Sequence, residues 1–345
     1  MRNHLMTFKI CTIGCGSMAS HVHGPSYRAY AALHDDTVLA ACCDLDEGKA
    51  ERFREAFGFR KRYRDIDTML DAEKPDAVCL VAPERLTARL SMQVMDKGYP
   101  LLMEKPPGLD VAETTAMIET AERVGVATQV AFNRRYMPLV RQLKRQLEKR
   151  FLPSDIQHIR YDFYRIGRLD DDFAATAIHG VDAVKFIAGS DYANVRFHYQ
   201  PIPNCGPQVV NMEMVCEFES GARAYLSFHP VSGVLVERAV VHAPNHSFFL
   251  NLPVEHSLDE PGALQHYEAG ELQTDEPDAA HADESDTGSA CAPKVCIAGG
   301  FYDENARFFD DIKAGRRPVG DLRSALQSVE IADCMRKRLS NYTKL

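Results

Sequence analysis

The stretch FKICTIGCGSMA, residues Phe8–Ala19, decides the fold of the first part of the chain. Its first six residues are mostly apolar, and they run directly into glycines in the pattern G-x-G-x-x-A. Gly14 allows a tight turn, Gly16 lets the backbone approach a pyrophosphate group, and Ala19 lets the following helix pack closely on the strand. The pattern therefore predicts a strand–turn–helix unit that binds a dinucleotide.

The start of the helix after these glycines is the predicted phosphate site. The first amide groups of a helix have no partner within the helix and carry partial positive charge, so they attract anions. We therefore expect Cys15, Ser17 and Met18 to contact the cofactor along with the two glycines. A plain strand–turn–helix without a ligand is the alternative, and the position of the motif at the head of a repeating strand–helix pattern disfavours it.

The first 132 residues alternate short apolar runs with amphipathic helical patterns. This alternation is typical of a parallel sheet covered on both faces, and right-handed crossovers then give a doubly wound domain. We therefore expect an α/β protein in which residues 1–132 form a Rossmann dinucleotide-binding domain. The expected strands are 8–13, 38–43, 76–82, 100–103 and 126–132, and the expected helices are 19–33, 47–57, 86–97 and 111–124.

After residue 132 the pattern changes to segments in which apolar and polar residues alternate, with turn residues between them. A period of two predicts a large, mostly antiparallel sheet with one face covered by helices, among them 138–149 and 178–187. We expect residues 133–345 to form this substrate-binding and oligomerisation domain. The open face favours a homo-oligomer, a dimer or a tetramer. The final helix, about 321–339, is amphipathic and could pack back on the first domain.

Composition excludes several classes of function. The 345 residues carry a formal net charge of −9, which disfavours nucleic-acid partners because those recruit Lys and Arg to phosphates. No apolar run approaches the roughly 18 residues of a membrane span, so no membrane association is expected. The ten cysteines form no CxxC pair, so we expect no metal site and reduced thiols in a cytoplasmic protein.

Asp44 stands at the end of the second predicted strand. A carboxylate at this point accepts hydrogen bonds from the adenosine ribose hydroxyls and repels a 2′-phosphate. The residue therefore favours NAD over NADP as the cofactor. The alternative role, a helix N-cap, is compatible with ribose binding.

A Glu-Lys-Pro triplet, Glu104-Lys105-Pro106, follows the fourth predicted strand, where a lysine points to the cofactor crevice. With the other motifs it makes nearly the whole chain resemble the Gfo/Idh/MocA family, named for glucose–fructose oxidoreductase and inositol dehydrogenase. The other motifs are the glycine pattern, the Ala82-Pro83 turn, the segment Ile178–Asp182, the segment Phe301–Asn305 and the final helix.

The resemblance implies hydride exchange between a nicotinamide and a carbon of a sugar, polyol or related carbohydrate. It implies that Lys105 polarises the reacting oxygen and that His179 is the acid/base. Histidine suits both directions because its pKa lies near neutrality, and a neighbouring ammonium stabilises a developing alkoxide. It also places the cofactor against Ala82, Pro83, Glu104 and Asn133.

The chain departs from the family's pattern at three positions. Ala175 replaces an aspartate four residues before the histidine, Glu84 replaces an asparagine, and Thr87 replaces a histidine. Asp182 lies three residues after His179, on the same helix face, and is the first candidate for the missing catalytic carboxylate. Its alternative is a surface or ion-paired aspartate. The second candidates are Asp171 and Asp172.

Three further side chains are candidates for substrate binding. Arg134 follows the last Rossmann strand, and Tyr164 and Arg165 end the segment IRYDFYR. Paired arginine donors suit a carboxylate or phosphate, and tyrosine and arginine over a sheet suit a carbohydrate. A solvated rim is the alternative, and the sequence does not decide which face of this strand lines the site.

Two other functions are compatible with the same motifs. One is a redox-neutral enzyme that uses tightly bound NAD for elimination or glycoside cleavage. The other is a noncatalytic protein that senses NAD or sugar, which Ala175 favours and which the intact Lys105 and His179 disfavour.

Overall fold

The computed structural model describes residues 7–274 and 292–344. The chain divides into two units, each of which is described by itself. Unit 1 comprises Met1–Asn133 with Asp278–Leu326, and unit 2 comprises Arg134–Pro277 with Gln327–Leu345.

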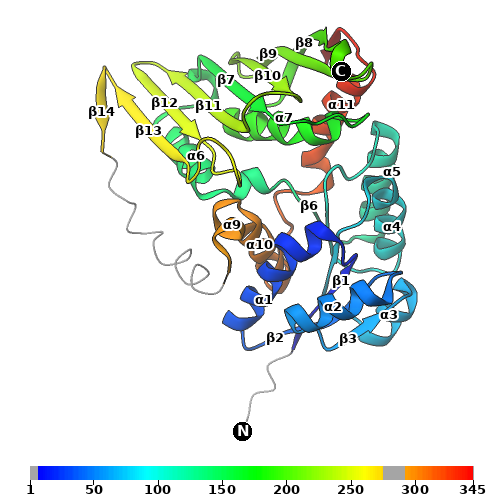
Figure 1. The fold of residues 1–345 in the computed structure, drawn as a ribbon. Coiled ribbons are helices and arrows are strands. Elements are labelled where there is room, and N and C mark those ends of the chain that lie inside the picture. The colour runs from blue at the N-terminus through cyan, green and yellow to red at the C-terminus, as the bar shows by residue number, and fades with distance from the viewer. Residues whose placement is uncertain (1–6, 275–291, 345) are drawn as a thin grey trace. The chain divides into compact units, whose positions relative to one another are not determined.

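Unit 1 is built on a six-stranded sheet in the order β3-β2-β1-β4-β5-β6, and every strand pairing in it is parallel (Figure 1). The reversal of strand order at β1 and β4 is the hallmark of a doubly wound fold. The predicted fold class is confirmed. The strands are β1 Phe8–Ile13, β2 Thr37–Cys43, β3 Lys61–Tyr63, β4 Ala77–Leu80, β5 Leu101–Met103 and β6 Thr128–Val130.

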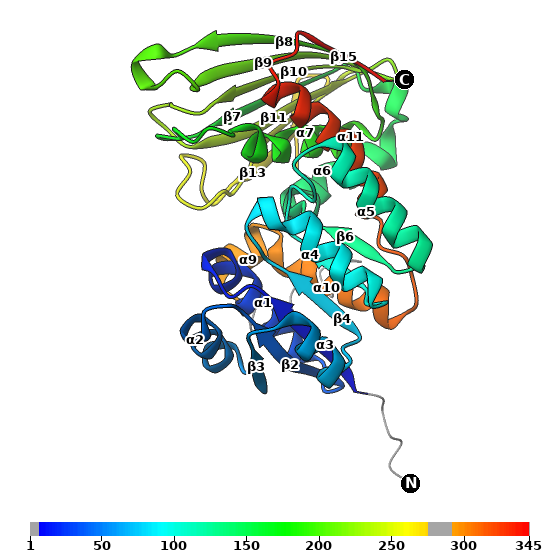
Figure 2. The same cartoon turned by 90° about the vertical axis from the view of Figure 1, so that its right-hand side faces the viewer.

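Helices cover both faces of this sheet. On one face, aromatic side chains of α1, α2 and α10 form a common core that includes Tyr27, Phe53 and Phe309. Helices α4 and α5 pack on the other face (Figure 2). The helices are η1 Ala19–His23, α1 Gly24–Leu33, α2 Glu47–Phe57, α3 Ile66–Glu73, α4 Glu84–Asp96, α5 Val111–Val124, α9 Lys294–Ala298 and α10 Phe301–Lys313.

Unit 2 is built on a nine-stranded sheet in the order β14-β13-β12-β11-β7-β10-β9-β8-β15. Among the described strands of unit 2, only the β7–β10 pairing is parallel, so the mostly antiparallel sheet is confirmed. The strands are β7 His158–Tyr164, β8 Tyr192–Pro201, β9 Val210–Phe218, β10 Arg223–His229, β11 Val236–Ala243, β12 His246–Asn251, β13 Ala263–Glu268, β14 Glu271–Gln273 and β15 Asn341–Thr343.

One face of this sheet packs on helices α6 (Pro138–Arg150) and α7 (Ala174–Ala188). Gly180 shows how close the packing is, because a Cβ added there would lie 2.8 Å from the ring of Phe228. In Figure 2 the opposite face of the sheet carries no labelled helix among the described residues of unit 2.

The division of the chain differs from the single predicted boundary between residues 132 and 133. Helices α9 and α10 return to unit 1 because Cys296, Phe308 and Phe309 share its aromatic core. Helix α11, Leu322–Arg336, passes from one unit to the other at residue 326 and ends three residues before its predicted end at 339.

Candidate active site

The glycine turn is fixed by two constraints on Gly14. Its φ of +94° is unfavourable for residues with a side chain, and an added Cβ would lie 2.0 Å from the carbonyl oxygen of Val81. Its amide donates to the carbonyl oxygen of Cys43 at 2.8 Å. The fold itself therefore requires glycine at this position.

Gly16 is not required by the fold. Its φ lies outside the left-handed region, and an added Cβ would meet nothing within 4 Å. The open space adjoins the first turn of η1, where Ala19 is fully buried. Neither packing nor backbone conformation requires a glycine here, so the position leaves room for the close approach of a ligand. The turn therefore fits the pyrophosphate of a dinucleotide.

Asp44 is tied to the glycine turn. Its Oδ2 accepts from the amide of Cys15 at 2.8 Å, and its Oδ1 accepts from the amide of Asp46 at 2.9 Å. It is not the helix N-cap, because Asp46 caps α2 by accepting from the amide of Lys49. Each Asp44 oxygen keeps a second lone pair, so the carboxylate is held in place and can still accept from a ribose hydroxyl.

The Ala82-Pro83 turn leads into α4, which begins at Glu84, two residues before its predicted start. Glu84 is exposed in the first helical turn. The hydroxyl of Thr87 is 3.4 Å from the carbonyl oxygen of Pro83, and this side chain is buried. Two of the three departures from the family's pattern therefore lie at the start of one helix.

The Glu104-Lys105 pair follows β5. The Lys105–Pro106 peptide bond is cis. Glu104 Oε2 accepts from the amide of Lys105 at 3.0 Å, and Oε1 is 2.8 Å from Nε2 of the buried His23. Burial alone would raise the pKa of Glu104, but His23 and the charge of Lys105 lower it below its ordinary value, so the carboxylate is ionised.

His23 is the site residue that sequence reasoning missed. It lies 81 positions from Glu104 in the chain, so no spacing rule connects the two. The available signal was a histidine directly after the apolar Val22 in the first helix, in the run Val22-His23-Gly24. A buried imidazole has to find a polar partner, and the Glu-Lys-Pro turn supplies it.

In unit 2, His179 lies on α7, as predicted, and its side chain is mostly buried. Ala175, one turn earlier, is 5% exposed and leaves only a methyl group where the family places a carboxylate. Lys105 belongs to unit 1 and His179 to unit 2.

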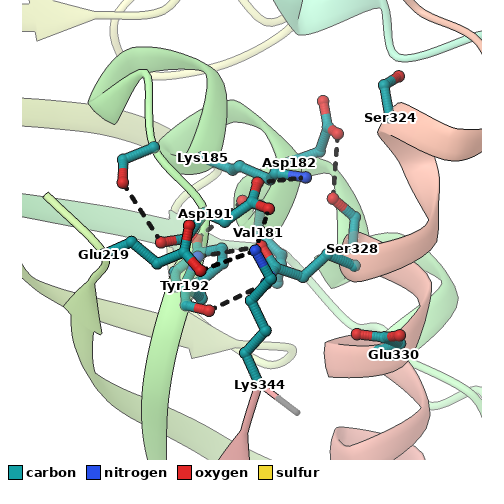
Figure 3. Close-up of polar contacts among 12 residues, drawn as sticks. Val181, Asp182, Lys185, Asp191, Tyr192, Glu219, Ser324, Ser328, Glu330 and Lys344 are labelled. Carbon is teal, nitrogen blue, oxygen red and sulfur yellow. Dashed lines mark hydrogen bonds and ion pairs between the residues drawn. The ribbon is translucent and has the colours of Figure 1, made fainter.

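Asp182 has partners of its own. Its side chain is fully buried and accepts two hydrogen bonds from Arg135, Nε to Oδ2 at 2.7 Å and Nη2 to Oδ1 at 2.5 Å. Ser328 of α11 donates to Oδ1 at 3.1 Å (Figure 3). The geometry matches the ion-pair alternative, because the carboxylate is engaged from two sides and has no exposed surface for a substrate.

The two other candidate carboxylates differ from each other. Asp172 accepts from the amide of Ala175 at 3.2 Å and from Arg336 at 2.8 Å, so it stabilises the start of α7. Asp171 is exposed. Of the acids near the start of α7 that the sequence singled out, Asp171 has the most solvent-accessible side chain.

The predicted substrate arginines surround an internal acid. Arg134 donates to both oxygens of Glu237 at 3.1 and 3.0 Å, Arg165 donates to it at 2.6 Å, and the Tyr161 hydroxyl donates at 2.7 Å. Burial would raise the pKa of Glu237, but the two guanidinium groups lower it to about 2. In unit 2, Arg134 and Arg165 therefore bind a carboxylate of the protein itself, that of Glu237.

The Glu237 cluster shows which side chains of β7 lie on the helix-covered face of the sheet and which lie on the opposite face. Tyr161, Phe163 and Arg165 point to the helix-covered side, where they meet Glu237 of the neighbouring β11. Tyr164 lies on the other face, and its hydroxyl donates to Asp162 at 3.1 Å. Its predicted contact with substrate would therefore come from the face opposite to that of Arg165.

Metal and membrane signals are lacking in the part of the chain that the structure describes. No group of three or more His, Cys, Asp or Glu side chains among residues 7–274 and 292–344 is arranged to hold a metal ion. Over the same ranges, no helix combines the length and the apolar character that crossing a membrane requires.

Comparisons with known proteins agree with this geometry. Residues 8–132 match the model of the family described as "Oxidoreductase family, NAD-binding Rossmann fold". D-glucoside 3-dehydrogenase of Escherichia coli is 28% identical over 40% of this chain and 38% of its own length. Myo-inositol 2-dehydrogenase of Thermotoga maritima is 24% identical over 54% of this chain and 57% of its own. The chain thus matches about two fifths to three fifths of the length of these relatives.

The likeness in fold extends further than the likeness in sequence. A levoglucosan dehydrogenase solved in complex with NADH superposes with a TM-score of 0.81 over 98% of this chain and 99% of its own, at 19% identity. Such low identity supports the shared two-part fold alone. Residues 8–132 therefore resemble the NAD-binding Rossmann domain of the Gfo/Idh/MocA oxidoreductase family.

Proposed function

We propose that this protein is an NAD-dependent oxidoreductase that transfers hydride between the nicotinamide and a carbon of a sugar, polyol or related carbohydrate. Two features of unit 1 together carry the proposal. The glycine turn, called the cradle below, is open at Gly16, and the Glu104 carboxylate accepts a hydrogen bond from the Lys105 amide. The relatives named for glucoside and inositol dehydrogenation support the carbohydrate class.

The cradle residues hold the cofactor in this proposal. Amide groups from Gly16 to Met18 bind the phosphates at the start of the first helix, and Asp44 accepts from the ribose. Because Asp44 is fixed by Cys15 and Asp46, its negative charge disfavours the 2′-phosphate of NADP. NAD, when bound, supplies or accepts the hydride.

The proton chemistry falls to Lys105 and His179. The Lys105 ammonium stabilises negative charge that develops on the reacting oxygen, and His179 takes the hydroxyl proton during oxidation or returns it during reduction. The buried ion pair with Arg135 makes Asp182 a positioning residue for α7. Because Ala175 stands one turn before His179, the histidine acts without a carboxylate at that place. We also expect the substrate to contact Arg134, Tyr164 and Arg165.

A second candidate function is a sensor of NAD or carbohydrate that performs no turnover. Ala175 favours it, because the turn before His179 lacks the carboxylate and Asp182 is occupied by Arg135. The two functions differ in one observable. A dehydrogenase changes the redox state of the nicotinamide when its substrate is added, and a sensor does not.

We also expect a homo-oligomer, a dimer or a tetramer, to form through the open sheet face. On this face Phe249 of β12 is 40% exposed and lies opposite Val240 of β11, which in turn pairs with Arg160 of β7. Apolar side chains on an uncovered sheet face favour burial against another surface. Phe249→Glu should convert a dimer or tetramer to monomer in light scattering, and an unchanged mass would exclude this face.

The proposed function is tested by adding a panel of hexoses, inositols and glycosides to the protein with NAD, and in the reverse direction to the protein with NADH and the corresponding keto sugars. The readout is the absorbance of reduced nicotinamide. Catalytic change with at least one carbohydrate supports the dehydrogenase. Binding of NAD and of a sugar without any redox change supports the sensor.

A further inference from the structure

A buried chain of hydrogen bonds in unit 1 ends at the backbone of Lys105. It runs from Asn305 of α10 to His23, from His23 to Glu104, and from Glu104 to the Lys105 amide. His23 and Asn305 are fully buried, and the Glu104 side chain is 12% exposed. Segments from three distant parts of the sequence therefore converge behind one lysine.

Both ring nitrogens of His23 have hydrogen-bond partners. Asn305 Nδ2 donates to the carbonyl oxygen of Phe301 at 2.6 Å, which orients the amide, and it lies 3.2 Å from His23 Nδ1. Because the nitrogen of an amide can only donate, His23 Nδ1 is the acceptor. The other ring nitrogen, Nε2, lies 2.8 Å from Glu104 Oε1 and donates to it, because a carboxylate only accepts.

The backbone holds His23 as firmly as its side-chain partners do. His23 ends the π-helical turn η1, in which the amide of Gly24 donates to the carbonyl oxygen of Ala19. Such turns insert one residue into a helix and are frequent at functional sites. Gly24 is packed so tightly that an added Cβ would lie 2.6 Å from the ring of Phe57. The helix therefore has little freedom to move the imidazole away.

We propose that His23 is a positioning residue for Lys105: its imidazole orients the Glu104 carboxylate, which in turn fixes the backbone turn that presents Lys105 to the substrate. This inference rests on the proposed function of Lys105. Glu104 keeps one oxygen on the imidazole and the other on the Lys105 amide, so loss of His23 frees the carboxylate to rotate. A displacement of about 1 Å at a reacting group can reduce a rate about a hundredfold.

The first experiment compares His23→Ala, His23→Gln and a matched control, His34→Ala. Glutamine can donate to Glu104 and accept from Asn305, so it keeps both hydrogen bonds without an ionisable ring. His34 is another histidine of unit 1, whose Nδ1 is 2.8 Å from the carbonyl oxygen of Tyr30. Thermal unfolding first checks that each variant is folded.

We expect His23→Ala to lower kcat at least about tenfold, the weak end of what positioned groups supply, with the NAD dissociation constant changed less than about twofold. His23→Gln should recover kcat to within about threefold of the wild type, and His34→Ala should leave it unchanged. Equal loss in His23→Gln and His23→Ala, or full kcat in His23→Ala, would overturn the proposal.

The second experiment needs no substrate, so it separates this inference from the proposed function. Lysines are labelled by reductive methylation with ¹³C formaldehyde, and the Lys105 signal is assigned by its loss in Lys105→Arg. The signal should move in His23→Ala and in Glu104→Gln and stay in place in His23→Gln and His34→Ala. An unmoved signal in His23→Ala contradicts the positioning role even if the protein turns over no carbohydrate.

Discussion

Replacing Gly16 by alanine separates cofactor binding from folding more sharply than any other change in the cradle. The added Cβ meets nothing within 4 Å, and the φ of Gly16 lies outside the left-handed region. A glycine-to-alanine change at such a position costs no folding free energy and can stabilise by about 0.4–1 kcal/mol. The methyl group instead occupies the space that we assign to the pyrophosphate.

The loss of affinity can be estimated from the hydrogen bonds at stake. A hydrogen bond to a charged group contributes about 1.5–3 kcal/mol, and about 1.4 kcal/mol corresponds to a tenfold change in affinity. If the methyl group breaks one amide–phosphate bond, Gly16→Ala weakens NAD binding about tenfold to a hundredfold. The midpoint of thermal unfolding without NAD should stay within about 2 °C of the wild type.

Two other glycines serve as controls. Gly14→Ala should destabilise the fold, because its Cβ would lie 2.0 Å from the carbonyl oxygen of Val81 and its φ is +94°. Gly233→Ala, in unit 2, also points into open space and should change neither property. Fluorescence titration with NADH and differential scanning calorimetry measure the two quantities. Unchanged NADH affinity in Gly16→Ala would refute the assignment of this turn as the pyrophosphate site.

Three further predictions concern charge. Asp44→Ala should reduce the preference for NAD over NADP at least about tenfold, because it removes the ribose acceptor and the charge that repels a 2′-phosphate. Parallel fluorescence titrations with both dinucleotides measure this preference. Tighter binding of NADP by the wild type would contradict the cofactor assignment. Asp182→Asn should lower the free energy of unfolding by about 3–5 kcal/mol, because it leaves Arg135 buried without its charge partner. Urea unfolding measures this free energy. A stable variant with only its turnover impaired would restore Asp182 as a catalytic carboxylate. Glu237 has a pKa of about 2 in the folded protein against an ordinary value of 4.5. Its ionisation therefore contributes about 3 kcal/mol to the free energy of unfolding above about pH 4.5, and this contribution is lost as the pH falls toward 2. Glu237→Gln should remove this part of the acid dependence in urea titrations at several pH values.

The sequence predicted most of unit 1 because local signals and global fold agree there. Strand β1, the glycine turn and Asp44 follow a motif with fixed spacing. Strand β3 and helix α3 were missed for physical reasons. Lys61–Tyr63 is a short edge strand with exposed, charged side chains, and Ile66–Glu73 is only eight residues long, so each offers few residues in which a hydrophobic period can be recognised.

The site was harder to predict because its partners are distant in the sequence. Periodicity correctly placed His179 and Asp182 on one helix, but it gave no means to foresee that Arg135 and Ser328 bind Asp182. The acid inside unit 2 did leave a signal. In the run Val236–Ala243, Glu237 occupies the same alternate positions as Ala239 and Val241, which face the core, so a buried acid with cationic partners was to be expected.

The most direct test of the account is turnover by the wild type, Lys105→Met and His179→Ala, measured by reduced-nicotinamide absorbance with the best carbohydrate from the panel. The account predicts that each substitution lowers kcat about 10²–10⁴-fold while the NAD dissociation constant changes less than about threefold. Near-full turnover in either variant would contradict the role assigned to that residue. Absence of any redox change in the wild type with the whole panel would contradict the dehydrogenase itself and leave the sensor.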